Sequence, residues 1–134
     1  MKKLIVIAGS ALFLSVPRVA EAATLFTVPV IYVTPQSLNF GLVLNKATAT
    51  NTFLVENMGS GVLAGAATVP PPFKIIGGGQ YKLRENEVQV VTITYTPSGA
   101  ETDTQTVKFT GGSGATATVT GKLLNPAAKR LKRP

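Results

Sequence analysis

Carboxylates that stand close together are the first residues in this sequence that could do chemistry, as acids, bases or metal ligands. Glu101 and Asp103 are two residues apart, and so are Glu85 and Glu87. Calcium needs six or more oxygen ligands, and neither pair has a further acidic residue beside it. We therefore interpret both pairs as solvated turn residues and predict no metal site.

Histidine and cysteine are absent from the 134 residues. Their absence excludes Cys/His zinc sites, Ser-His-Asp and Cys-His nucleophiles, and acid–base catalysis by imidazole. It also excludes disulfides, so burial and strand pairing must hold the fold together. We predict that the protein is not an enzyme and that it has no cofactor.

Glycine-rich and proline-rich segments punctuate the chain at residues 70–72, 77–79 and 111–114. Neither glycine segment precedes a helical pattern or the Lys-Ser/Thr of a phosphate-binding loop, so both are interpreted as hairpin turns. The three prolines lie inside the domain, before Phe73. They favour a rigid crossover over a polyproline ligand.

The first 22 residues have the pattern of a secretory signal peptide. Lys2 and Lys3 precede an apolar stretch at residues 4–16, which is too short to span a bilayer comfortably. Ala20-Glu21-Ala22 then matches the small-x-small pattern before a cleavage point. An N-terminal membrane anchor and a buried helix are the alternatives. The prediction is an exported protein, located in the periplasm or at the cell surface.

A basic tail at residues 127–134 follows the predicted domain, residues 23–126. The whole chain carries 13 Lys and Arg against 6 Asp and Glu; without residues 1–22 these become 10 and 5, a net charge of +5. The tail could contact an anionic surface, or it could be a solvated, disordered segment that aids solubility. Nucleic-acid binding is disfavoured by export and by the lack of an aromatic platform. The four basic residues of the tail are Lys129, Arg130, Lys132 and Arg133.

Between these ends the sequence predicts an antiparallel β-sandwich of seven or eight short strands. The clearest pair is a hairpin in which residues 105–109 and 115–123 flank the turn at 111–114, with small and apolar residues on one face and threonine on the other. Residues 63–68 are read as an edge strand. In residues 87–95 both parities are apolar, which predicts a bulge at Val90-Val91 or burial of both faces.

The order of the short motifs resembles the ASH (Hydin-like) domain, an immunoglobulin-like module of the major-sperm-protein/PapD-like group that also occurs in "choice-of-anchor D" proteins. The resemblance covers roughly residues 34–124. One departure is Arg84-Glu85-Asn86, where the family usually has Pro-Gly. The motifs are Leu38-x-Phe40-Gly41-x-Val43, Asn57-x-Gly59-Ser60, Leu63, Phe73, Leu83 and Val91-x-Ile93-x-Tyr95-x-Pro97.

The resemblance implies binding or scaffolding and assigns structural roles to the motif positions. The expected roles are a core aromatic, a bend, an amide side chain that ends a strand, and a buried hydroxyl that needs a hydrogen-bond partner. The positions are Phe40, Gly41, Asn57, Gly59, Phe73, Leu83, Tyr95 and Pro97.

Two hypotheses for function follow from these observations. In the first, the protein is an exported, non-catalytic module that binds or scaffolds protein partners in the cell envelope through sheet edges and end loops. In the second, it is a structural subunit that self-assembles by strand exchange at its edges, with residues 23–33 as the exchanged segment. A sandwich is expected to have its first strand in residues 23–33. We therefore expect this segment to pair within its own sheet, which favours the binding module over the self-assembling subunit.

Overall fold

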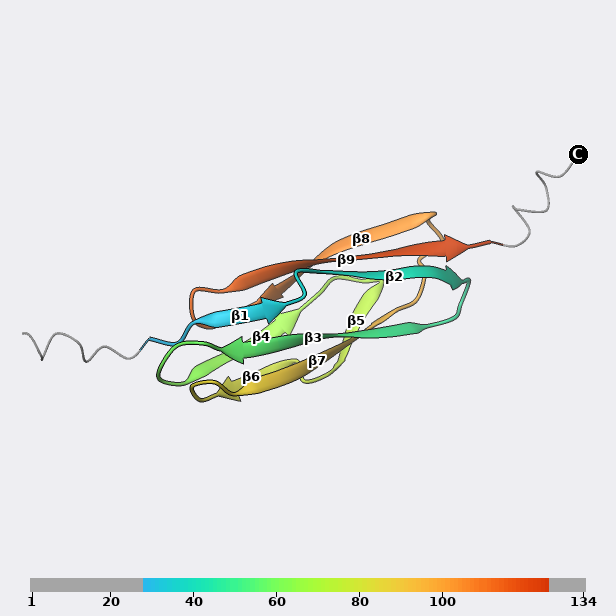
Figure 1. The fold of residues 1–134 in the computed structure, drawn as a ribbon. Helices are drawn as coiled ribbons and strands as arrows, with labels where there is room; N and C mark the ends of the chain where they lie inside the picture. Colours follow the sequence, from blue (N-terminus) through green and yellow to red (C-terminus); the bar gives the residue numbers. More distant parts are fainter. Residues whose placement is uncertain (1–27, 126–134) are drawn as a thin grey trace, which may run out of the picture.

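The structure is a computed structural model that describes residues 28–125, in which every regular element is a β-strand (Figure 1). The predicted signal peptide and the basic tail lie outside the described residues. The nine strands of the described part are β1 (Ile31–Thr34), β2 (Ser37–Leu44), β3 (Ala49–Asn57), β4 (Leu63–Thr68), β5 (Phe73–Gly77), β6 (Gln80–Leu83), β7 (Val88–Tyr95), β8 (Thr102–Phe109) and β9 (Ala115–Leu124).

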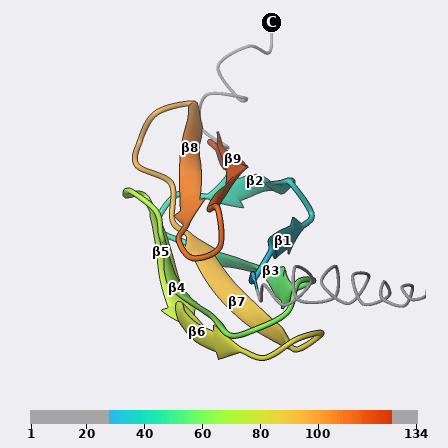
Figure 2. The ribbon, with the colours of Figure 1, turned by 90° about the vertical axis from the view of Figure 1, so that its left-hand side faces the viewer.

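These strands form two sheets that pack face to face (Figure 2). The four-stranded sheet has the order β1-β3-β7-β5, and the five-stranded sheet has the order β2-β9-β8-β4-β6. The chain leaves the first sheet at Thr34 and joins the second at Ser37, so that β2 runs parallel to β9. The remaining pairs are antiparallel. The predicted all-β sandwich is confirmed, with one parallel pair and nine strands instead of seven or eight.

The hairpin of β8 and β9 shows how the sequence pattern produces the sandwich. Phe109 pairs with Ala115 across the turn, and Val107 pairs with Ala117 two residues further on. These residues face the core, while the alternate threonines face solvent, because strand side chains alternate between the two faces. The turn closes with a hydrogen bond of 2.8 Å from the Gly114 amide to the Gly111 carbonyl.

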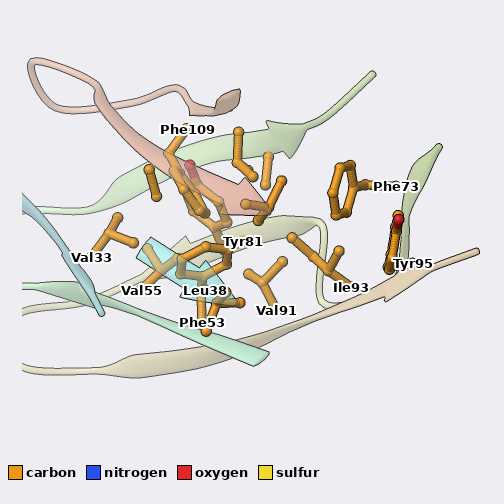
Figure 3. Close-up of a cluster of buried hydrophobic side chains, with 14 of the residues drawn as sticks. Val33, Leu38, Phe53, Val55, Phe73, Tyr81, Val91, Ile93, Tyr95 and Phe109 are labelled. Carbon is orange, nitrogen blue, oxygen red and sulfur yellow. The ribbon is translucent and has the colours of Figure 1, made fainter. Parts of the chain in front are cut away.

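The core lies between the two sheets and contains two groups of packed aromatic rings (Figure 3). Phe53 and Phe109 meet edge to face, with ring centroids 5.5 Å apart. Phe73 and Tyr95 stack at 4.8 Å, and Phe40 packs against both. Such pairs add about 0.5–1.5 kcal/mol each beyond the burial of their area. The side chains labelled in Figure 3 are Val33, Leu38, Phe53, Val55, Phe73, Tyr81, Val91, Ile93, Tyr95 and Phe109.

Three local predictions are wrong. Residues 77–79 do not form a hairpin turn, because β5 and β6, which they join, lie in different sheets. β7 pairs with β3 in one continuous register, so Val90-Val91 is not bulged, and Val88 and Val90 are not buried but about half exposed. The irregular register in the pairings of β7 lies instead on the β5 side, between Ile75 and Gly77, and β2 has another one between Asn39 and Leu42. β4 is not an edge strand either, because β6 adds outside it.

Candidate functional site

The clearest polar cluster lies where β7 leads into β8, around Asp103. The Tyr95 hydroxyl donates to Asp103 Oδ2 at 2.8 Å, and the Ser98 hydroxyl donates to Oδ1 at 2.6 Å. The Ser98 amide also donates to Oδ2, at 3.2 Å. Asp103 was predicted to lie in a solvated loop with Glu101, but it is part of β8 and is tied to the core.

Tyr95 reaches Asp103 by lying across the core over Gly121. Asp103 and Gly121 are paired residues of β8 and β9, whereas Tyr95 comes from β7 of the other sheet. A Cβ on Gly121 would overlap the Tyr95 ring, so the absent side chain makes the space that the ring fills. The cluster therefore joins the two sheets, and the carboxylate is occupied by this structural task.

Hydrogen bonding and burial shift the acid–base behaviour of this cluster. Burial raises the pKa of Tyr95 to about 12, and the hydrogen bond and negative charge of Asp103 act in the same direction. Burial also acts to raise the pKa of Asp103. Hydrogen bonds from the hydroxyl and amide of Ser98 and from Tyr95 outweigh it and lower that pKa below the ordinary 3.8.

We expect stability to fall at both ends of the pH range because of these shifts. The fold favours protonated Tyr95, so its contribution is complete below its ordinary pKa of 10.0 and is lost as the pH rises through about 12. The fold favours ionised Asp103, so its contribution is present above pH 3.8 and is lost as the pH falls through the lowered folded-state value. Urea unfolding over a pH series measures both losses.

Tyr95→Phe is the variant that isolates the alkaline effect. It should cost about 1–2 kcal/mol at neutral pH and reduce the alkaline loss of stability. A residual loss is expected from Tyr81, because burial raises the pKa of that residue too. An unchanged alkaline loss in Tyr95→Phe would contradict the assignment, and Asp103→Asn provides the matching test at acid pH.

Asn57 forms a second polar cluster at the opposite end of the core. Its side chain is fully buried at the end of β3. Oδ1 accepts hydrogen bonds from the amides of Val30 (3.1 Å) and Gly59 (3.0 Å). Nδ2 donates to the carbonyls of Gly61 (3.0 Å) and Leu83 (3.1 Å). One side chain thus ties together the segment before β1, the β3–β4 turn and the end of β6.

The other motif residues also lie at structural positions. A Cβ on Gly59 would overlap the backbone of Val28 and Val30, so only glycine allows the chain to pass there. Gly41 has a φ of 73° within β2, which runs on past it to Leu44. Leu83 and Pro97 are buried and Phe40 is partly buried.

The remaining candidate segments form turns and connections. Glu87 Oε1 accepts a hydrogen bond of 2.7 Å from the Arg84 amide, and Asn86 has the positive φ of 66° that such a turn allows. Residues 70–72 connect β4 of one sheet to β5 of the other. They border an open groove of about 560 Å³, lined by Ala67, Thr68, Val69, Pro71, Pro72, Phe73, Lys74, Ile75, Thr94 and Thr96.

Within residues 28–125 no three acidic, histidine or cysteine side chains are placed to share a metal ion. No helix of this part is long and apolar enough to cross a membrane. The basic residues predicted to touch an anionic surface, Lys129, Arg130, Lys132 and Arg133, lie outside the described residues.

Apolar side chains gather on the outer side of the four-stranded sheet, and sequence reasoning missed them. We call this surface the apolar face. Four members alternate with core residues along β1, β3 and β7, the other two lie next to the ends of β1 and β3, and each exposes between 44% and 56% of its area. They are Val30, Tyr32, Leu54, Met58, Val88 and Val90.

Comparison with known proteins gives matches in structure alone. No protein-family model matches the chain, and no curated protein matches it in sequence. The ASH/PapD-like domain 7 of human CEP192 is similar with a TM-score of 0.58 and 15% identity, over 73% of this chain and 87% of that one. A protein of unknown function from Porphyromonas gingivalis W83 is similar with a TM-score of 0.63 and 14% identity, over 72% and 48%.

The Escherichia coli chaperone DraB is also similar, with a TM-score of 0.53 and 14% identity, over 75% of this chain and 57% of that one. A protease, a family 123 glycoside hydrolase and a xyloglucanase match too, each over less than a third of its own length. The resemblance drawn from the sequence motifs is thereby confirmed for the fold. Residues 28–125 form an immunoglobulin-like domain with the fold of the ASH and PapD-like domains.

Proposed function

We propose that this protein is an exported, non-catalytic module that binds or scaffolds other proteins in the cell envelope. The observation that carries the proposal is the apolar face, since large exposed apolar patches mark interaction surfaces. Its six side chains lie together on one sheet.

The polar groups that could have supported catalysis support this proposal indirectly. Asp103 is held by Tyr95 and Ser98, and Asn57 is held by four backbone groups. A catalytic group needs free access to a substrate, and these groups are already committed to the fold. The proposal of export rests on the signal-peptide pattern of residues 1–22. The proposal of protein binding is supported by the similar structure DraB, which is a chaperone by name.

Strand exchange is the alternative, and the position of β1 argues against it. β1 pairs with β3 of its own chain over the four residues from Ile31 to Thr34. A subunit that donates this segment would have to give up these pairings. With β1 in place, one chain supplies all strands of the four-stranded sheet, and this supports the binding module over strand exchange.

We expect the purified protein to be a monomer by light scattering behind a sizing column. A chain that ends at Pro126 should behave in the same way, at both low and high salt. Species that grow with concentration and survive both changes would favour strand exchange. Association that disappears with the tail or with salt would point to an anionic surface.

Binding itself is tested by partner capture from an envelope extract with Val90→Lys beside the unchanged protein. Val90 is exposed on the apolar face, so lysine should remove captured proteins without unfolding the domain. Thr104→Lys is the matched control, because Thr104 is exposed on the outer side of the other sheet. Capture of no protein by the unchanged chain would contradict the proposed function.

A further inference from the structure

The apolar face is continuous across three neighbouring strands. Tyr32 of β1 lies opposite Glu56 of β3, and Glu56 lies opposite Val88 of β7. In the next row of outward-facing residues, Leu54 of β3 lies opposite Val90 of β7 on one side and Thr34 of β1 on the other. Side chains directly opposite each other in antiparallel strands have Cβ atoms about 5 Å apart, so these side chains touch or nearly touch.

The apolar face ends abruptly along the same strands. Beyond Leu54 and Val90, the next outward pair is Thr52 and Thr92, followed by Thr50 and Thr94. At the other end, Met58 donates a hydrogen bond of 2.8 Å from its amide to the Val30 carbonyl and so extends the face by one more row. One half of the outer surface is therefore mainly apolar, and the other half carries threonine together with Lys74 of β5, which lies opposite Thr94 (the strands are shown in Figure 1).

Glu56 is the single charged residue within this face. Its side chain is only partly exposed, and no residue among 28–125 gives its carboxylate a hydrogen bond or an ion pair. β1, β3 and β7 carry no lysine or arginine at all. A partner that covers the face would strip water from this carboxylate, and an unpaired buried charge is costly.

The position of Glu56 argues against a second copy as the occupant. Pairing of this face with the same face of a second copy would bring no lysine or arginine from β1, β3 or β7, so both Glu56 carboxylates would be buried among apolar side chains without a cation. A partner that carries one cation in the matching position removes the cost and adds a charge-assisted hydrogen bond.

We infer that the apolar face binds a protein segment that presents apolar side chains around a single lysine or arginine, whose cation pairs with Glu56. This inference rests on the proposed function and names the surface and the chemistry of the partner. Tyr32 and Val88 lie on either side of Glu56 and so flank the pair.

The test is a selection of linear peptides from a random phage-displayed library on the immobilised protein. We expect the enriched peptides to share one lysine or arginine between apolar residues. A synthetic peptide of this kind, measured by calorimetry, should bind Glu56→Gln about tenfold or more weakly. Val90→Lys should abolish binding, whereas Thr104→Lys on the other sheet should leave it unchanged.

Several results would overturn the inference. They are enrichment of peptides without a cation, equal binding by Glu56→Gln or Val90→Lys, and no enrichment over an unrelated protein. A dimer that Val90→Lys dissociates would make a second copy the occupant and would also overturn it. Peptide binding that appears only after removal of residues 23–27 would also overturn the inference, because it would make these residues of the chain itself the occupant of the apolar face.

The outcome can be separated from that of the proposed function. If envelope proteins are captured equally by the unchanged chain, Glu56→Gln and Val90→Lys, binding occurs elsewhere on the module and this inference alone fails. Thermal unfolding of each variant shows whether it folds, since substitutions at exposed positions away from special features usually change stability by less than about 0.5 kcal/mol.

Discussion

Replacing Gly121 by alanine is expected to lower the free energy of unfolding by about 3 kcal/mol or more. The new methyl group would occupy the space of the Tyr95 ring. The ring cannot withdraw easily, because it is fully buried, is stacked on Phe73 at 4.8 Å and is held at its hydroxyl by Asp103. One added carbon must therefore push the two sheets apart or break these contacts.

Urea unfolding followed by circular dichroism measures this effect, since the chain has no tryptophan. Gly77→Ala is the matched control: its Cβ would lie an ordinary 3.8 Å from Thr92, and we expect a change of less than about 0.5 kcal/mol. The double variant Gly121→Ala with Tyr95→Val should be more stable than the sum of the single changes predicts. Strict additivity would show that the ring is not the obstacle.

Asn57→Ala is expected to cost about 4 kcal/mol of unfolding free energy. It removes four hydrogen bonds at once and leaves two amides and two carbonyls of the surrounding backbone without their partner. Two of these backbone groups belong to Val30 and Leu83, which are far apart in sequence. Their loss should loosen the segment before β1 and the end of β6 together.

Hydrogen exchange on the variant locates the damage. Protection should fall first at the amides of Val30 and Gly59, which donate to the lost oxygen. Asn51→Ala provides the control within the same strand, because among residues 28–125 that side chain accepts a hydrogen bond from the adjacent Thr52 amide alone. If Asn51→Ala lost as much stability as Asn57→Ala, the loss in Asn57→Ala would come from strand propensity and not from the buried hydrogen bonds.

The parts of the fold that sequence could predict are those with local patterns. The β8–β9 hairpin follows from alternation around a glycine turn, and Asn57 falls on the inward parity of its strand. The turn at Asn86 follows from the tolerance of asparagine for positive φ. Each of these can be read from one continuous stretch of sequence.

The parts that sequence could not predict depend on contacts between distant strands. The link between Tyr95 and Asp103 needs the ring to cross the core, and the place that Gly121 makes for it comes from another sheet. The apolar face was missed for a different reason. Valines on both parities of β7 predict burial of both faces or a bulge, whereas Val88 and Val90 face solvent. Such a pattern also fits a strand with one core side and one binding side.

The parallel pairing of β2 with β9 sets the order in which the domain can become complete. Ser37 pairs with Thr118, so the two strands are separated by about 80 residues of chain. β9 lies between β2 and β8, so it connects β2, at one edge of the five-stranded sheet, to the other three strands. A chain that emerges from its N-terminus keeps β2 unpaired until residues 115–124 follow. We therefore expect chains truncated before β9 to be more sensitive to proteases than the whole domain.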